Sequence, residues 1–448
     1  MLIMAKRQKV SFVCQECGYD TSSWLGKCPE CGSWQSFKEV KLAPLGESVS
    51  SRQKVNNPPQ SLSAVQSGDK HRISSGFSEF DTVVGGGIVT GGVMLVAGDP
   101  GIGKSTLLLE LALNVANKHT VLYASGEESS EQIKLRAERL KGSYLKTPKQ
   151  SENLKVYSIT DVDEVARTIE ESKPSLVIVD SIQTMQSDNA GGLSGSVGQV
   201  RYSALILISA AKSLNIPVVI VGHVTKEGMV AGPMVLSHMV DTVLFLEGEK
   251  FTKMRLLRSL KNRFGPVDEV GVFLMEEAGM HEVTSPEQLF LETQQEGVSG
   301  SIITSTLEGS RAFLVELQAL VISTKYPMPR RVVSGLDGKR VELLLAVLTK
   351  HCHLPVDSSD VFVNVAGGMK LSDPALDLGV CLAVYSSVKN IPLSKIVGIG
   401  EVGLLGELRS VAGIEKRVKE AKKMGYTTII TPQTHTSLQD VIKSMNKK

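Results

Sequence analysis

The chain has 448 residues, of which 42% are hydrophobic, 21% are charged and 17 are prolines. This composition is typical of a globular protein, and the length favours about three domains. The formal net charge of +2 excludes a generally basic surface, so any nucleic acid must bind to local patches. The longest uncharged stretch, Thr82 to Gly98, is too short to cross a membrane, and the start MLIMAKRQKV lacks the apolar segment of a secretory signal. We therefore expect no membrane partner.

Four of the six cysteines form two CxxC pairs near the start of the chain. The segment CQECGYDTSSWLGKCPECG places Cys14 and Cys17 in the first pair and Cys28 and Cys31 in the second. Two such pairs direct four thiolates to one point, which is the ligand set of a closed, structural Zn²⁺ site, whereas a redox CxxC needs only one pair. Because the other two cysteines are scattered, the pattern favours a reducing, cytoplasmic compartment over a disulfide framework.

The segment VMLVAGDPGIGKSTLLLELAL indicates a buried strand, a glycine-rich loop and an apolar helix. Its loop matches the pattern GxxxxGK[ST], in which glycines let backbone N–H groups surround phosphates at a helix N-terminus. Lys104 is expected to contact the outer phosphates of ATP, and the Ser105 hydroxyl is expected to bind Mg²⁺. The predicted ATP-binding residues are Gly98, Asp99, Pro100, Gly101, Ile102, Gly103, Lys104, Ser105 and Thr106.

Three further apolar segments end in polar residues that suit ATP hydrolysis. SLVIVDSIQT contains Asp180, a candidate for orienting Mg²⁺. VLYASGEES ends on Glu127 and Glu128, either of which could activate the attacking water, although such a pair also suits a helix start. PVVIVGHVTKEG contains His223, where either a nucleotide sensor or a structural histidine would lie. The alternation of apolar strands with helical segments predicts a parallel α/β sheet.

A basic segment without acidic residues runs from Lys250 to Arg263 and ends in the motif KNRFG. Lys261 and Arg263 in this motif fit a solvated face, a contact with DNA phosphates, or a contact with the γ-phosphate bound by a neighbouring subunit. Two glycine-rich stretches, MQSDNAGGLSGSVGQVR and KEGMVAGPMVLSH, have the composition of mobile loops. Arg201 and Lys226 lie in these stretches, and flexible surface loops would account for the composition.

The segment ISSGFSEFDTVVGGGIVTGGVMLVAGDPGIGKSTLLLELA is similar to the ATPase core shared by RecA recombinase, the DnaB-type helicases and the KaiC proteins. With a four-Cys ribbon before this core and KNRFG after it, the chain resembles the bacterial RadA family over essentially its whole length. The resemblance implies a homo-oligomeric ring, expected to be a hexamer, that uses ATP, Mg²⁺ and Zn²⁺. It further implies ATP hydrolysis that depends on single-stranded or branched DNA, and branch migration in concert with RecA recombinase.

The same resemblance assigns roles to particular residues. It implies that Glu127 is the catalytic glutamate, and that Lys261 and Arg263 act on the nucleotide of an adjacent subunit, with DNA binding linked to that contact. It also implies that the two glycine-rich stretches face the channel of the ring and contact single-stranded DNA, which makes Arg201 and Lys226 candidate DNA contacts.

The carboxyl-terminal segments, including DVFVNVAGGMKLSDPALDLGVCLAV, resemble the proteolytic domain of Lon. The position of the Lon serine holds Ala375 and that of the lysine holds Glu415, and these two residues cannot replace a nucleophile and its base. We therefore expect an α+β domain that keeps the fold without protease activity. Basic residues in YPMPRR, Lys339, Arg340 and the helix from Lys416 to Lys423 suit a second DNA surface, and a solvated face is the alternative for that helix. An ATP-dependent protease and a KaiC-like nucleotide switch remain as alternative functions.

The predicted order of domains follows from these segments. A zinc ribbon covers residues 1–40, and the polar stretch NNPPQSLSAVQSGD marks a linker over residues 41–70. A RecA-like ATPase domain that includes KNRFG covers residues 71–285, and the Lon-like domain covers residues 286–448.

Overall fold

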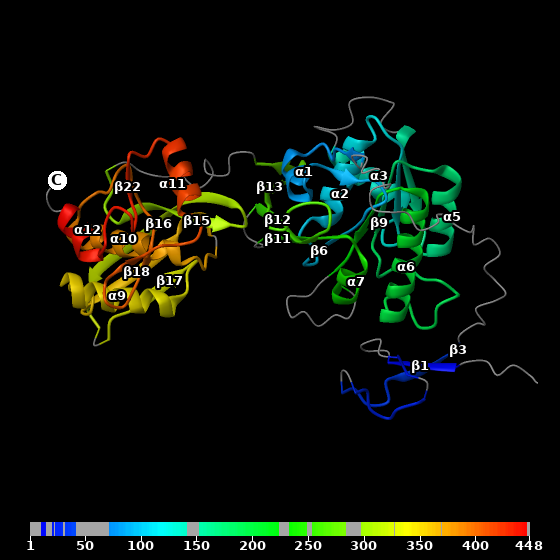
Figure 1. The fold of residues 1–448 in the computed structure, drawn as a ribbon, viewed down its shortest axis with the longest axis horizontal. Helices are drawn as coiled ribbons and strands as arrows, with labels where there is room; N and C mark the ends of the chain where they lie inside the picture. The colour runs from blue at the N-terminus through cyan, green and yellow to red at the C-terminus, as the bar shows by residue number, and fades with distance from the viewer. Residues whose placement is uncertain are drawn as a thin grey trace, which may run out of the picture. The chain divides into compact units, whose positions relative to one another are not determined.

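Figure 1 presents the computed structural model of the chain, which divides into two compact units. Unit 1 comprises Met1–Val267 and Gly271–Glu282, and unit 2 comprises Asp268–Val270 and Val283–Lys448. The structure describes residues 10–14, 20–21, 23–29, 32–41, 71–140, 152–223, 233–248, 253–283, 297–326, 328–368 and 370–445. Among these residues, no helix is long and apolar enough to cross a membrane.

Some predicted features lie outside the described residues. They are Cys17, Cys31, Lys226 and positions 42–70 of the predicted linker.

The described amino-terminal residues form a small antiparallel sheet. Its strands are β1 (Val10–Cys14), β2 (Asp20–Thr21) and β3 (Phe37–Lys41), in the order β2-β1-β3. The buried cluster of this sheet contains Cys14, Cys28 and Phe37. So few apolar side chains cannot offset the entropy of ordering the segment, which is why such ribbons depend on a bound metal.

A nine-stranded sheet forms the ATPase core, in the order β14-β13-β12-β11-β6-β10-β9-β7-β8. The strands β6 to β11 run parallel, and β12 to β14 extend the sheet in antiparallel fashion. The strand bounds are β6 (Val93–Gly98), β7 (Val121–Ser125), β8 (Leu154–Ser158), β9 (Leu176–Asp180), β10 (Val218–Val221), β11 (Thr242–Glu247), β12 (Met254–Asn262), β13 (Val270–Glu276) and β14 (Gly279–Glu282). The prediction of an α/β core with a parallel sheet is confirmed, with this antiparallel extension added.

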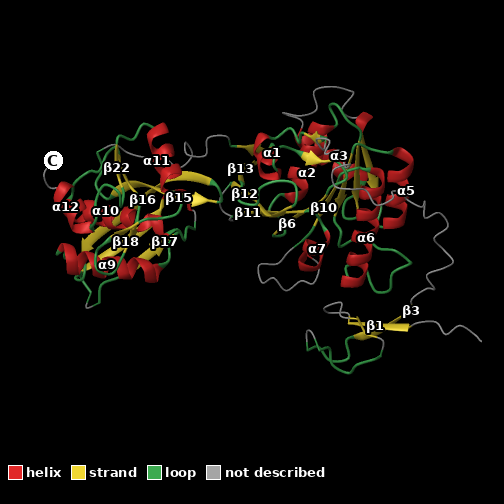
Figure 2. Ribbon diagram, viewed as in Figure 1, coloured by secondary structure: helices red, strands yellow, loops and turns green. Residues whose placement is uncertain are grey.

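Helices cover both faces of the core sheet, as Figure 2 shows. One buried cluster includes Leu107 and Leu111 of α2, and the other includes Ile169 of α5 and Leu207 of α6. Burial on both faces explains why the central strands are continuous runs of Val, Ile and Leu. The helix bounds are α1 (Ser78–Val84), α2 (Lys104–Val115), α3 (Ser130–Arg139), α5 (Val162–Ser172), α6 (Val197–Leu214) and α7 (Pro233–Met239). A short pair, β4 (Arg72–Ile73) and β5 (Ile88–Val89), flanks α1 in the sequence.

Unit 2 is built on a six-stranded mixed sheet in the order β17-β18-β16-β15-β19-β22. One buried cluster joins the sheet to α9, α10 and α12, and a second cluster joins it to α11. The strands are β15 (Ser301–Glu308), β16 (Arg311–Ser323), β17 (Arg331–Ser334), β18 (Ser359–Val365), β19 (Ile396–Gly398) and β22 (Thr428–Ile430), with a separate pair β20 (Glu401–Val402) and β21 (Leu408–Arg409). The helices are α9 (Gly338–Cys352), α10 (Asp377–Lys389), α11 (Ile414–Lys423) and α12 (Leu438–Met445), with short 3₁₀ turns at Ala366–Gly368 and Pro374–Leu376.

A buried ion pair lies beside the position that corresponds to the Lon serine. Ala375 is fully buried, whereas Glu415 is exposed on α11. Arg417, 1% exposed, pairs with Asp373 at 2.7 Å and donates to the Ser305 carbonyl at 2.6 Å. Arg417 therefore connects α11 to β15 and to the start of the 3₁₀ turn at Pro374–Leu376.

One carboxyl group lies in the core between α2 and β14. Glu110 has no exposed surface, and the backbone N–H of Met280 donates to both of its carboxyl oxygens at 3.0 Å. Burial disfavours the charged form and raises the pKa of Glu110 to about 8. The folded core therefore keeps this proton at neutral pH.

Glu110→Gln is expected to make unfolding of the ATPase core less dependent on pH. Because the unfolded carboxyl titrates near 4.5 and the folded one near 8, native stability falls as the pH rises between these values. The variant does not titrate, so its thermal midpoint should match the native midpoint near pH 5 and exceed it at pH 8. Glu131→Gln, on the exposed surface of α3, is the control and should show no such gain at pH 8. Equal shifts for Glu110→Gln at both pH values would contradict the burial of a protonated carboxyl.

Candidate nucleotide-binding site

The phosphate-binding loop connects β6 to α2 at the carboxyl edge of the parallel strands. Gly98 ends β6 with φ 152°, and a Cβ there would lie 2.3 Å from the Leu246 carbonyl oxygen of the adjacent strand. Gly103 has φ 111°, a left-handed conformation that L-residues rarely adopt. Both glycines of the motif are thus required by the path of the loop, which brings backbone N–H groups to the start of α2.

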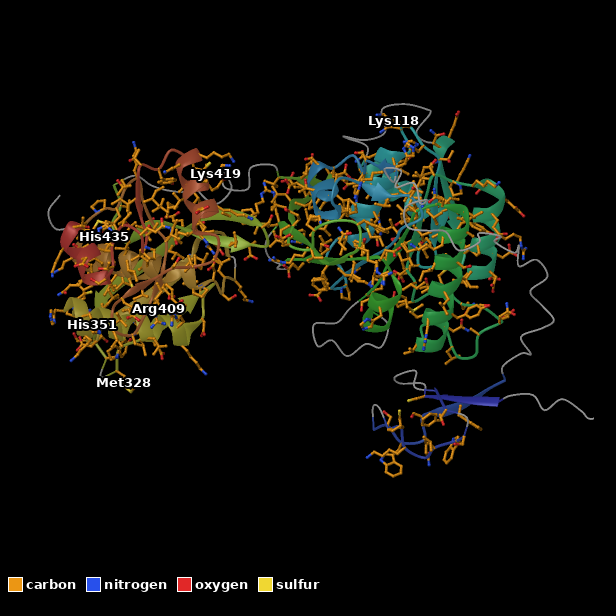
Figure 3. All side chains as sticks on the ribbon, viewed as in Figure 1. Lys118, Met328, His351, Arg409, Lys419 and His435 are labelled. Atoms are coloured by element: carbon orange, nitrogen blue, oxygen red, sulfur yellow. The ribbon has the colours of Figure 1, made fainter. Side chains whose placement is uncertain are left out.

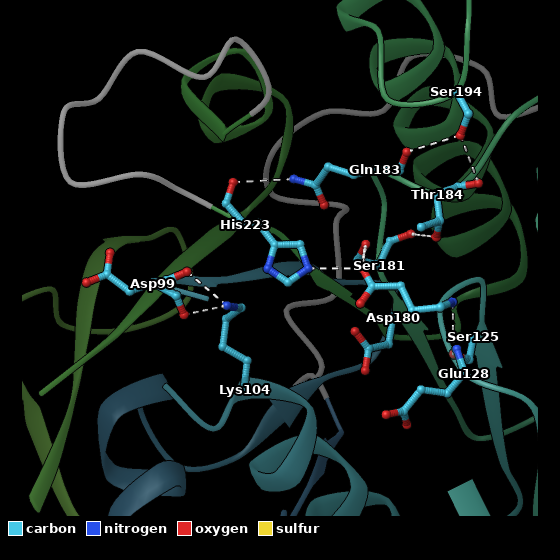
Figure 4. Close-up of polar contacts among 12 residues, drawn as sticks. Asp99, Lys104, Ser125, Glu128, Asp180, Ser181, Gln183, Thr184, Ser194 and His223 are labelled. Atoms are coloured by element: carbon cyan, nitrogen blue, oxygen red, sulfur yellow. Dashed lines mark hydrogen bonds and ion pairs between the residues drawn. The ribbon is translucent and has the colours of Figure 1, made fainter. Parts of the chain in front are cut away.

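Lys104 is buried at the first turn of α2 (Figure 4). Its ammonium donates to the carbonyls of Gly98 at 2.9 Å and Asp99 at 3.0 Å. Burial lowers the pKa of Lys104, and the negative charges of Asp180 and Glu127 oppose that shift. Lys104, Asp180 and Glu127 therefore lie close enough for their charges to interact.

Asp180 ends β9, and its two carboxyl oxygens differ in their hydrogen bonds. The hydroxyl of Tyr123, a fully buried residue of β7, donates to Asp180 Oδ2 at 2.7 Å. Among the described residues, Asp180 Oδ1 is buried and has no hydrogen-bond partner. A buried carboxylate oxygen of this kind is costly unless it binds a cation, so Asp180 and the half-buried Ser105 fit a Mg²⁺ ion.

The two candidate glutamates after β7 have different partners. Glu127 accepts a hydrogen bond from Ser181 Oγ and lies 3.0 Å from His223 Nε2. His223 and Ser181 are labelled in Figure 4. The hydrogen bond to His223 is the largest cause that lowers the pKa of Glu127 to about 2. Glu128 instead forms an ion pair with Arg136 of α3, and burial raises its pKa. Glu127 is therefore the glutamate that faces Lys104 and the end of β10.

The structure does not bring Lys261 and Arg263 to the phosphate-binding loop of the same chain. Thr242 of β11 pairs with Asn262 and with Met94, so KNRFG lies at the amino edge of β6, opposite the loop. Lys261 Nζ donates to the carbonyls at the end of α7, and Arg263 pairs loosely with Asp241 at 3.5 Å. The Arg263 side chain is 59% exposed and can reach a group outside the chain.

Sequence reasoning missed Tyr123, Ser181 and Gln183. Tyr123 looks like an ordinary strand residue, and its hydroxyl reaches Asp180 only because β7 lies next to β9 in the sheet. Gln183 donates to the His223 carbonyl at 3.4 Å, and its own amide oxygen is buried without a partner among the described residues. Ser181 follows Asp180 directly, and Gln183 lies three residues after it. This closeness to Asp180 is the one sequence signal that could have suggested these two residues.

Three family models match parts of this chain. The family described as AAA domain matches residues 58–229, the one described as rubredoxin metal binding domain matches 12–39, and the one described as subunit ChlI of Mg-chelatase matches 338–435. "DNA repair protein RadA" of Streptococcus pyogenes is 47% identical over 432 residues, which are 96% of this chain and 94% of that protein. Its counterpart in Bacillus subtilis is 45% identical over 435 residues, 96% of this chain and 93% of that protein.

The chain belongs to the RadA family of DNA repair proteins. Similar solved structures include the RadB recombinase, with 23% identity, a TM-score of 0.38, and coverage of 47% of this chain and 99% of that one. A DnaB-like replicative helicase has 18% identity, a TM-score of 0.41, and coverage of 48% of this chain and 62% of that one. The predicted fold class is confirmed. This RadA family member is an α/β protein with a zinc ribbon, a RecA-like P-loop core and a Lon-like carboxyl-terminal domain.

The glycine-rich stretch that follows Asp180, predicted to contact DNA, is held by the buried side-chain amide of Gln199. Gln199 Nε2 donates to the carbonyls of Ser187 at 3.0 Å and Ala190 at 2.7 Å, while Gln199 Oε1 accepts from the Ser187 N–H. Arg201 lies on α6 and is exposed. The segment is therefore held by specific contacts, which its glycine-rich composition did not indicate. The residue predicted for the second loop, Lys226, lies outside the described part of the chain.

Several arginines that were predicted to offer a second DNA surface form internal pairs. Arg330 pairs with the buried Asp360 at 2.7 Å, and Arg340 pairs with the buried Asp377. On α11, Lys423 pairs with Glu420, whereas Lys419, labelled in Figure 3, is exposed. Arg330 and Arg340 thus form ion pairs within unit 2, and their charges are not unpaired at the surface.

The described part of the predicted zinc site fits a metal. Cys14 and Cys28 are each 1% exposed and belong to the same small buried cluster. Ser36 lies 3.1 Å from Cys14 Sγ, which suits a hydrogen bond to a metal-bound thiolate. Cys17 and Cys31 complete the set in sequence, so these four thiols would hold Zn²⁺ and supply most of the stability of the ribbon.

Removal of zinc is expected to unfold the ribbon and spare the ATPase core. Trp24 and Trp34 are the two tryptophans of the chain, and both lie in the ribbon, so tryptophan anisotropy reports on that module alone. A strong chelator should lower the anisotropy and separate Lys27 from the Trp34 ring, now 5.5 Å apart, while ATP binding is unchanged. Cys14→Ser should purify with little zinc, and the control Cys352→Ser should keep it. Full zinc content in Cys14→Ser would contradict the ligand assignment.

Proposed function

We propose that this protein is a DNA-dependent ATPase that drives branch migration of recombination intermediates in DNA repair. The observation that carries the proposal is the convergence of Lys104, Asp180 and Glu127 at one edge of the core sheet. Relatives that cover nearly the whole chain are named as DNA repair proteins. We further propose single-stranded and branched DNA and RecA recombinase as partners, a hexameric ring as the assembly, and the cytoplasm as the location.

ATP hydrolysis in this proposal uses the groups at the carboxyl edge. The Lys104 ammonium and the backbone N–H groups of residues 98–106, Pro100 excepted, bind the phosphates. Asp180 and Ser105 would hold Mg²⁺, which would neutralise charge on the phosphates. Glu127 accepts a proton from the attacking water. With a pKa of about 2 it is ionised but weakly basic, so loosening of its bonds to His223 and Ser181 would make it a better base. His223 thereby acts as the sensor that links nucleotide state to Glu127.

Lys261 and Arg263 act, in our proposal, on nucleotide bound by an adjacent subunit. Their place at the edge of the sheet opposite the loop of their own chain favours a contact in trans, and the exposure of Arg263 leaves it available. A planar guanidinium suits the charge that develops on a transferred phosphoryl group. DNA binding would then be linked to hydrolysis through the subunit boundary, with Arg201 and Lys226 as DNA contacts.

We assign residues 1–40 to the ribbon, 41–70 to a linker, 71–285 to the ATPase domain and 286–448 to a Lon-like domain without protease activity. A fully buried alanine at position 375 offers no nucleophile, which disfavours the alternative of an ATP-dependent protease. DNA-dependent turnover separates the proposal from the other alternative, a KaiC-like nucleotide switch.

Replacement of the two adjacent glutamates tests the proposed function. Glu127→Gln should lower DNA-stimulated ATP hydrolysis by about 10²- to 10⁴-fold, the range for loss of a general base, and retain ATP binding. Glu128→Gln, the matched control, loses only an ion pair with Arg136 and should stay within a few-fold of native. Three-strand branch migration with RecA should stop in the first variant and continue in the second. The proposal would be contradicted if DNA did not increase ATP hydrolysis by the native protein, or if both variants lost ATP hydrolysis equally.

Mixing of two inactive variants tests the contact in trans. Arg263→Ala should lose about three to five powers of ten in rate at saturating DNA, because an arginine supplied by a neighbour contributes that much elsewhere. Lys104→Ala should not bind or hydrolyse ATP. In rings that contain both variants, some subunit boundaries join the intact phosphate-binding loop of an Arg263→Ala subunit to the intact Arg263 of a Lys104→Ala subunit. Mixing should therefore restore part of the ATP hydrolysis.

A contact of Arg263 with DNA phosphates makes the opposite prediction. In that case higher DNA concentration or lower salt restores hydrolysis by Arg263→Ala without any mixing. That outcome would overturn the contact in trans.

A further inference from the structure

Arg255 belongs to the basic segment that leads to KNRFG, yet it is buried. Its residue is 7% exposed, and it is the second residue of β12. Arg255 Nε donates to the carbonyl of Ile102 at 3.0 Å, and one terminal nitrogen donates to the carbonyl of Met254 at 2.7 Å. This arginine therefore contacts the phosphate-binding loop rather than solvent or nucleic acid.

Strand register explains how β12 reaches the loop. Leu246 of β11 pairs with Gly98 at the end of β6, and Glu247 pairs with Leu256 of β12. Arg255, the residue before Leu256, thus lies just past the carboxyl end of β6, where the loop begins. Gly248 leaves space for the side chain, since a Cβ there would lie 2.8 Å from Arg255 Cδ. The chain places a glycine where the arginine must pass.

The hydrogen bond to Ile102 fixes one peptide plane of the loop. In a trans peptide the C=O of one residue and the N–H of the next point in opposite directions. When Arg255 holds the Ile102 carbonyl on the β12 side, the N–H of Gly103 points away from Arg255, toward the interior of the loop. This N–H belongs to the last glycine of the motif, directly before Lys104. Backbone N–H groups at such positions bind phosphate oxygens.

We propose that Arg255 is a positioning residue for ATP binding, which acts by orienting the Ile102–Gly103 peptide so that its N–H faces the nucleotide phosphates. The guanidinium suits this role because its rigid fork donates to two carbonyls in fixed directions, which the single ammonium of lysine does not reproduce. The proposal requires the P-loop alone and is independent of DNA, of branch migration and of the contact in trans.

Arg255→Met tests the proposal because it keeps most of the side-chain volume without leaving a buried charge unpaired. The measured quantities are the affinities for ADP and AMP in the presence of Mg²⁺, by displacement of a ribose-labelled ADP, and the thermal midpoint without nucleotide. ADP carries the outer phosphate that the oriented N–H would bind, and AMP lacks it. Loss of a charge-assisted hydrogen bond predicts about a tenfold to hundredfold weaker affinity for ADP, with AMP changed less than about threefold.

Arg258→Met is the matched control on the same strand. Its arginine is half-buried, lies opposite Phe245 in the strand register and pairs with Glu247, so ADP affinity should stay near the native value. Arg255→Lys keeps the charge and should bind ADP with intermediate affinity, and it replaces the methionine variant in the comparison if that variant fails to fold. Native ADP affinity in the folded variant, or an equal loss for ADP and AMP, would overturn the positioning role.

Discussion

Parallel pairing of β6, β10, β9 and β7 brings four strand ends to one edge of a sheet that is buried on both faces, and the polar groups of the site extend from those ends. Gly98 ends β6, Asp180 ends β9, and Glu127 and His223 each follow a neighbouring strand by two residues. The backbone hydrogen bonds that hold the strands in register therefore also set the distances between the lysine, the aspartate and the glutamate. A shift of one residue in any of these strands would turn its terminal side chain to the opposite face of the sheet.

The antiparallel strands β11 and β12 join the two edges of this sheet. At one end of β12, Arg255 contacts the phosphate-binding loop of its own chain, and at the other end Lys261 and Arg263 extend toward the amino edge. The same strand therefore carries a contact to the loop of its own chain and the motif at the opposite edge of the sheet. If KNRFG contacts the nucleotide of an adjacent subunit, as proposed, one strand connects two nucleotide sites.

Local pattern was enough to predict the ribbon, the phosphate-binding loop and the strands that end on Asp180 and Glu127, because each depends on residues close together in sequence. Local pattern could not distinguish Glu127 from Glu128, because the two are distinguished by their partners. His223, which is distant in sequence, contacts Glu127, and Arg136 pairs with Glu128. Arg255 was grouped with a basic segment because alternation in β12, which buries every second side chain, is invisible until the strand is paired. The internal pairs of Arg330 and Arg340 likewise depend on acidic partners that are distant in sequence.

The buried carboxyl of Glu110 alters the charge of the folded protein. With a pKa of about 8, this group is mostly neutral at pH 7, so the folded chain is close to one unit more positive than the formal +2. Unfolding at neutral pH exposes Glu110 to water, where it releases its proton to the buffer. The enthalpy of unfolding measured by calorimetry therefore includes the heat of protonating that buffer, and it will differ between phosphate and Tris at the same pH.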